Sequence, residues 1–98
     1  MKITKIIWLF EFVDKLEQKH EVQRHEVEQV IYNTEDPPQF FFVEKGDVKG
    51  EYMYTAMGCP ESGRYLRVFF IYKEDQEAAL IISAREMTDQ EKKRYAKK

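Results

Sequence analysis

Two arginines, Arg64 and Arg85, stand where they could hold a phosphate group. Arg64 opens one predicted β-strand, Arg85 follows the next strand, and Tyr95 lies on the helix after it. An arginine keeps its charge in a protein and offers a planar fork of N–H groups to phosphate oxygens. We therefore predict that the three side chains converge on one small site. The alternative, that each arginine pairs with a carboxylate such as Glu51 or Glu91, stays open on the residues alone.

His20 is a second candidate for chemistry, because an imidazole exchanges a proton near neutral pH. It follows Lys19 near the end of a predicted helix, where the helix dipole stabilises the protonated imidazole by about 0.3 to 1 kcal/mol. Proton transfer is one role to expect. The alternative is that His20 completes the apolar stripe of that helix and hydrogen-bonds a carbonyl group.

The segment from Asp89 to Lys98 is basic in an otherwise acidic chain. It holds five lysines or arginines, including Lys92 and Arg94, against two acidic residues, whereas the whole chain has a formal net charge of −2. By default such residues form a solvated helix face, and attraction of RNA is the alternative. Tyr95 either anchors this helix to the sheet or directs its hydroxyl into the site.

Several classes of chemistry have no sequence signal here. The chain lacks a glycine-rich phosphate loop, an HExxH motif and a Gly-x-Ser-x-Gly motif. Cys59 is the only cysteine, so no intrachain disulfide and no Cys/His zinc site are possible. The apolar run Ile6–Phe10 is too short to span a bilayer. We expect no metal, no cofactor and no membrane contact, and a reducing cytoplasm; the role of Cys59 stays open.

Length and patterning predict one α+β domain over residues 1–98. Apolar residues at helical spacing predict two N-terminal helices, and alternating runs predict a four-stranded, mainly antiparallel sheet. Thr88 and Glu91 form a capping box for a last helix. The predicted elements are helices from Leu9 to His20 and from about Arg24 to Tyr32, strands from Gln39 to Glu44, Glu51 to Met57, Arg64 to Lys73 and Ala78 to Ala84, a turn from Lys45 to Gly50, and a helix from Asp89 onward.

The sequence resembles the BrnT family, toxins of bacterial type II toxin–antitoxin pairs with a RelE-like fold, in the order α-α-β-β-β-β-α. The similarity covers nearly the whole chain. Trp8 stands twelve residues before His20, and Glu51 falls in the second strand. Gly63-Arg64-Tyr65-Leu66 matches the family's Gly-Arg-x-Leu, and Ile81-Ile82-Ser83-Ala84-Arg85, followed by Glu91 and Tyr95, matches its closing signature.

This resemblance implies a metal-independent endoribonuclease that inhibits translation. It also implies a BrnA-like ribbon-helix-helix antitoxin, through which alone the protein would reach DNA. The competing interpretation is a RelE-like domain without catalysis, which binds its antitoxin and acts as a co-repressor. The residues leave both open.

If the protein is a nuclease, the RNA supplies the nucleophile, its ribose 2′-hydroxyl. We expect His20 to transfer protons, with Glu51 as the alternative base, and the two arginines to stabilise charge on the phosphorus. The predicted catalytic residues are His20, Glu51, Arg64, Arg85 and Tyr95, and the predicted RNA-binding residues are Lys19, Lys92 and Arg94.

Overall fold

A five-stranded sheet forms the centre of the fold in a computed structural model that describes residues 1–33, 37–45 and 51–96. The strands lie in the order β1-β5-β4-β3-β2, and every neighbouring pair is antiparallel except β1 with β5, which is parallel. Their bounds are β1 Lys5–Ile7, β2 Gln39–Lys45, β3 Tyr52–Gly58, β4 Leu66–Lys73 and β5 Ala78–Glu86. The architecture is α+β.

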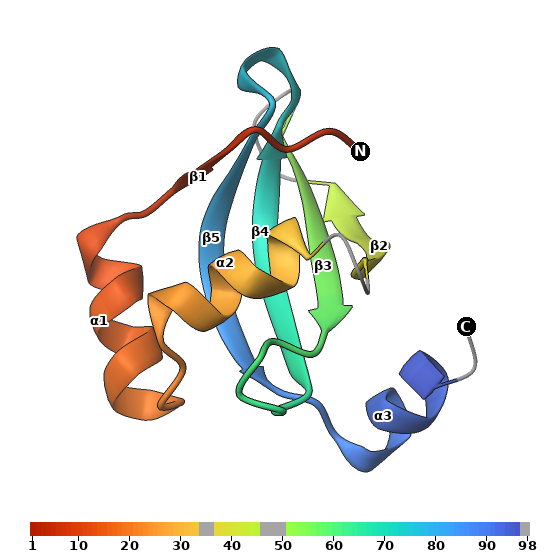
Figure 1. The fold of residues 1–98 in the computed structure, drawn as a ribbon. Helices are drawn as coiled ribbons and strands as arrows, with labels where there is room; N and C mark the ends of the chain where they lie inside the picture. The colour runs from red at the N-terminus through yellow and green to blue at the C-terminus, as the bar shows by residue number, and fades with distance from the viewer. Residues whose placement is uncertain (34–36, 46–50, 97–98) are drawn as a thin grey trace.

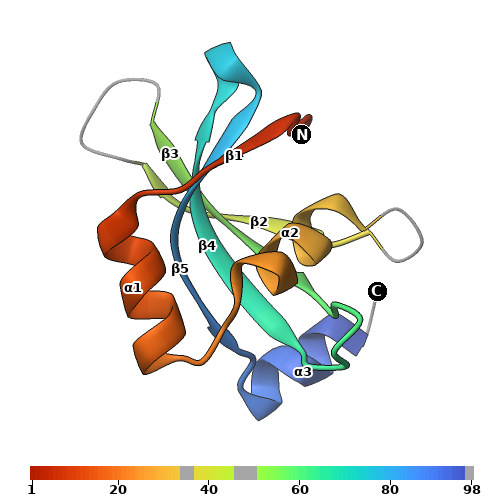
Figure 2. The ribbon, with the colours of Figure 1, turned by 60° about the vertical axis from the view of Figure 1, so that its left-hand side comes forward.

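In the described part of the chain three α-helices flank the sheet, as can be followed in Figures 1 and 2. Two of them, α1 (Phe10–Lys19) and α2 (Arg24–Tyr32), lie on one side of it, and α3 (Asp89–Ala96) follows the lower end of β5. A short 3-10 turn, Glu74–Gln76, joins β4 to β5. The sheet therefore has one face under α1 and α2, and among the described helices only α3 contacts the other face.

β4 is the central strand of the sheet. β4 pairs with β3 on one side and with β5 on the other. Its residues Leu66, Val68 and Phe70 are fully buried against the helices, while Arg67 and Phe69 on the opposite face are half-buried. This alternation follows from the two-residue period of a strand.

The predicted helices agree with the observed ones, and the capping box at the start of α3 is confirmed. The Thr88 N–H donates to Glu91 Oε1 at 2.8 Å, and the Glu91 N–H donates to Thr88 Oγ1 at 3.2 Å. The predicted turn from Lys45 to Gly50 lies, after its first residue, outside the described residues.

The prediction of a four-stranded, mainly antiparallel sheet was wrong by one strand. The apolar run near the N-terminus contributes β1, which pairs in parallel with β5 through Lys5 opposite Ala78 and Ile7 opposite Leu80. The Thr4 N–H donates a hydrogen bond to the carbonyl oxygen of Glu77 at 2.7 Å, which extends this pairing beyond the strand. Three residues are too few for a recognisable alternation, and the partner strand lies some seventy residues away in the chain.

Phe70→Ala tests the core. We expect it to lower the free energy of unfolding by about 3 to 5 kcal/mol, because it leaves a cavity beneath the rings of Phe40 and Tyr54. Urea denaturation followed by circular dichroism gives the value. Phe10→Ala is the matched control, since that ring is 86% exposed, and should change stability by less than about 0.5 kcal/mol. Equal losses in the two variants would contradict this description of the core.

Candidate functional site

Arg64 lies on the helix side of the sheet, where it joins the start of β4 to the helices. Its Nη1 donates to Glu26 Oε1 at 3.1 Å and to the carbonyl oxygen of Glu21 at 2.8 Å. Its Nε also lies 3.7 Å from a carboxylate oxygen of Glu86. The Glu26 side chain is only 4% exposed. Arg64 therefore has a bonding pattern that fits a structural clamp.

Glu26 stays ionised in spite of its burial. Burial raises the pKa of its carboxyl, but other groups lower that pKa overall, chiefly the Gln23 N–H at 3.1 Å, the Ser62 hydroxyl at 2.8 Å, and the charge of Arg64. A buried carboxylate without its cation would be costly, so Glu26 depends on Arg64.

His20 contributes its backbone to this region. Its N–H closes α1 on the carbonyl of Leu16 at 3.2 Å, and its own carbonyl oxygen lies 3.5 Å from Arg64 Nη2. The side chain is exposed, as is that of Lys19. The apolar stripe of α1 therefore ends at Leu16, and the alternative that His20 completes it was wrong.

Arg85 lies on the other face of the sheet. In the pairing of β4 with β5 it stands directly opposite Arg67, while the next residue, Glu86, stands opposite Leu66 on the helix side. The prediction that Arg64, Arg85 and Tyr95 converge on one site was therefore wrong. Arg64 belongs to the helix face, and Arg85 belongs with Arg67.

One carboxylate, that of Glu91, serves both Arg67 and Arg85. Arg85 donates to Glu91 Oε1 at 2.7 Å and to Oε2 at 2.9 Å, and Arg67 donates to the same Oε2. The ring of Phe69 lies beneath both guanidinium groups, with its centroid 4.8 Å from Arg67 Cζ and 5.6 Å from Arg85 Cζ. Arg67 Nε also donates to the Thr55 hydroxyl at 3.0 Å. The pairing of Arg85 with Glu91 is the alternative that the sequence had left open.

The charges of this arginine pair, as we name Arg67 and Arg85, are fixed. The hydrogen bond with Arg85 is the main cause that holds the pKa of Glu91 far below its ordinary value, and the same bond raises the pKa of Arg85. With Glu91 the pair carries one more positive than negative charge. Their side chains are 25% and 33% exposed, so an anion arriving from solvent can reach them.

The side chains of α3 pack on aromatic rings beside this pair. The Arg94 guanidinium lies 4.3 Å from the ring centroid of Phe41, and Lys92 Nζ lies 6.0 Å from that of Tyr65. Tyr95 is 4% exposed and sits in a small cluster with Met57 and Met87. Tyr95 is therefore an anchor that fixes α3 to the sheet.

Glu51 does not approach the arginine pair. It forms an ion pair with Lys73 at the far end of β4, six residues from Arg67, a distance of about 20 Å along a strand. Within the described residues no group of three or more His, Cys, Asp or Glu side chains is placed to hold a metal ion. No helix in the described part is both long and apolar enough to cross a bilayer.

Sequence reasoning missed Arg67 and Phe69. Alternation along the strand places both residues on one face. If the pairing that begins with Lys73 opposite Ala78 continued without a shift, however, Arg67 would lie opposite Ala84. A register shift after Phe70 moves Arg85 into that place, so that Arg67 and Arg85 stand together. The one-residue bulge had no signal in the sequence.

Compared with models of known protein families and with curated proteins, the chain matches none of them. Its family therefore stays a prediction that rests on the resemblance in sequence.

Arg64→Ala tests the structural clamp. We expect the variant to lose about 2 to 3 kcal/mol of unfolding free energy, because it leaves the Glu26 carboxylate buried without a cation. Urea denaturation measures the loss. Glu86→Gln, which removes only the exposed carboxylate near Arg64, should cost less than about 0.5 kcal/mol. A stable Arg64→Ala variant would instead free Arg64 for another role.

Acid titration tests the Glu91 carboxylate. Its pKa is lower in the folded protein than its ordinary 4.5, so its stabilisation is present above the unfolded value and is lost as the pH falls toward the folded value. The wild type should therefore begin to lose its advantage in unfolding free energy over Glu91→Gln below about pH 5 and should continue to lose it, with no plateau, as the pH falls past about 3. Glu74→Gln, at an exposed glutamate, is the control. A constant difference between wild type and Glu91→Gln would contradict the assignment.

Proposed function

We propose that the protein is the toxin of a BrnT-like type II toxin–antitoxin pair, a metal-independent endoribonuclease of RelE-like fold that binds RNA phosphate at Arg67 and Arg85. The observation that carries the proposal is the sharing of one carboxylate by two guanidinium groups on the sheet face away from α1 and α2. The resemblance in sequence supplies the family. The α+β arrangement, with two helices on one face and α3 at the other, is compatible with it.

The arginine pair suits the charge that develops in RNA cleavage. When the ribose 2′-hydroxyl attacks the adjacent phosphorus, negative charge builds on the phosphoryl oxygens, and fixed guanidinium groups stabilise it without reorganising. Thr55 and Glu91 hold the Arg67 side chain in place. Glu91 remains ionised, so its role is to orient the two arginines; it is too weak a base for proton transfer.

Stacking is the second contribution that this face offers to RNA. The half-buried rings of Phe41 and Phe69 already lie against guanidinium groups, and unstacked bases bind to such surfaces. Arg94 and Lys92 extend the positive charge along α3. We assign no proton transfer at this face to His20 or Glu51, because neither approaches the arginine pair, and none to Arg64, which lies on the helix face.

The second candidate is the non-catalytic alternative, a RelE-like module that acts through a BrnA-like ribbon-helix-helix antitoxin as a cytoplasmic co-repressor. One observation favours it: both Arg64 and Arg85 pair with carboxylates of the same chain.

Induced expression separates the two candidates. For a nuclease, the wild type should arrest growth and degrade RNA, and Arg67→Ala and Arg85→Ala should each restore growth. Each variant should also bind a fluorescent single-stranded RNA of about twelve nucleotides roughly tenfold more weakly. A tenfold loss corresponds to about 1.5 kcal/mol of binding free energy, which is typical of one hydrogen bond to a charged group.

Arg24→Ala is the matched control, because Arg24 is exposed and makes only a 3.9 Å contact with Glu17. Circular dichroism confirms that every variant is folded. Normal growth and intact RNA with the wild type would support the non-catalytic candidate. If both variants bind RNA as tightly as the wild type, the arginine pair is not the RNA-binding site and the proposal is contradicted.

A further inference from the structure

A hollow of about 400 Å³ lies beside the start of α1, on the opposite side of the sheet from the arginine pair. Phe10, Val13, Asp14 and Glu17 recur along α1 at spacings of three and four, so they share one face of that helix. The lining residues are Trp8, Phe10, Val13, Asp14, Glu17 and Arg24.

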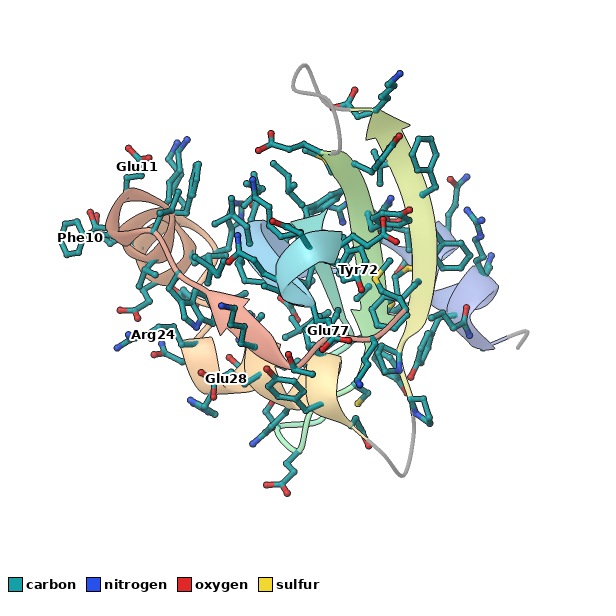
Figure 3. All side chains as sticks on the ribbon, turned by 90° about the horizontal axis from the view of Figure 1, so that it is seen from above. Phe10, Glu11, Arg24, Glu28, Tyr72 and Glu77 are labelled. Atoms are coloured by element: carbon teal, nitrogen blue, oxygen red, sulfur yellow. The ribbon has the colours of Figure 1, made fainter. Side chains whose placement is uncertain are left out.

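One apolar side chain of this hollow, that of Phe10, is unusually exposed, while Trp8 and Val13 are half-buried. Phe10 is 86% exposed, the most of any large apolar residue in the described chain, and its neighbour Leu9 is 39% exposed. Figure 3 shows Phe10 pointing away from the body of the molecule, with Glu11 and Arg24 at the same end. A phenylalanine in that position adds nothing to the core, and a contiguous exposed apolar surface often marks an interaction site.

The polar lining of the hollow holds two carboxylates and one guanidinium group, those of Asp14, Glu17 and Arg24, so carboxylates are in excess. Asp14 accepts a hydrogen bond from the Gln18 amide at 2.9 Å and forms no ion pair within the described residues. Glu17 has only the loose 3.9 Å contact with Arg24. A hollow that combines aromatic side chains with a carboxylate that has no ion pair among the described residues is complementary to an apolar side chain next to a lysine or arginine.

We propose that this hollow docks a basic amphipathic helix of another protein, with one apolar side chain between Trp8 and Phe10 and one basic side chain on Asp14. The volume lies within the range of about 300 to 1,000 Å³ found for binding pockets. Helices bind grooves in this way through residues one turn apart. The inference does not depend on the proposed function, because α1 lies on the opposite side of the sheet from the arginine pair.

Trp8 is the only tryptophan of the chain, so its fluorescence reports directly on the hollow. The probe is a peptide of about fifteen residues with leucine and lysine at helical spacing, long enough to form a helix. We expect a saturable change in Trp8 emission with this peptide and none with a matched leucine–glutamate peptide. Phe10→Ala and Asp14→Asn should each weaken binding at least about tenfold, as for central contacts of an interface.

Glu11→Gln is the matched control for charge, because Glu11 lies on the same helix but outside the lining of this hollow; it should leave binding unchanged. Three results would overturn the proposal. These are no saturable change, an equal response to the two peptides, or binding that survives both Phe10→Ala and Asp14→Asn.

Two further measurements test other occupants of the hollow. Self-association in sedimentation experiments that Phe10→Ala abolishes would assign the hollow to a second copy of the chain. A Trp8 response to phosphatidylglycerol vesicles without a response to the leucine–lysine peptide would assign it to a membrane surface. Either result replaces the peptide as the occupant.

Discussion

The carboxylate of Glu91 joins three successive elements of the fold, β4, β5 and α3. It accepts hydrogen bonds from Arg67 on β4 and from Arg85 at the end of β5, and it caps the first turn of α3 through the Thr88 N–H. At 14% exposure the carboxylate is largely shielded from water, so these charge-assisted bonds are stronger than surface ion pairs. This side chain and the buried Tyr95 together fix α3 to the sheet.

The Glu91 contact in turn requires the bulge between β4 and β5. With a regular ladder Arg85 would alternate to the helix face, where Glu86 now stands beside Arg64. The extra residue shifts the register by one, and a shift of one residue moves every later side chain of β5 to the opposite face. Arg67 and Arg85 thus lie on the same face of the sheet. Neither the alternation of residues along each strand nor the length of the hairpin predicts this arrangement.

The sequence predicted the elements that local physics determines. The bounds of α2 follow from the spacing of its apolar residues, and the start of α3 follows from the pairing of Thr88 with Glu91. It failed where distant segments meet: β1 becomes a strand only by pairing with β5, and Arg64 is directed by the buried Glu26. The candidate site was recovered only in part, through Arg85, because the position of its partner Arg67 is set by register.

Arg64 and Arg85 show why residue type alone did not identify the site. Around Arg64 two carboxylates, those of Glu26 and Glu86, face one guanidinium group, so the local charge is already negative and repels an anion. Around Glu91 the ratio is reversed, since one carboxylate faces two guanidinium groups. An incoming phosphate gains attraction only at the second place, and it gains more there because Phe69 and Phe41 keep part of that face apolar. The balance of charge around Arg64 and around the arginine pair therefore decides which of the two places can attract a phosphate.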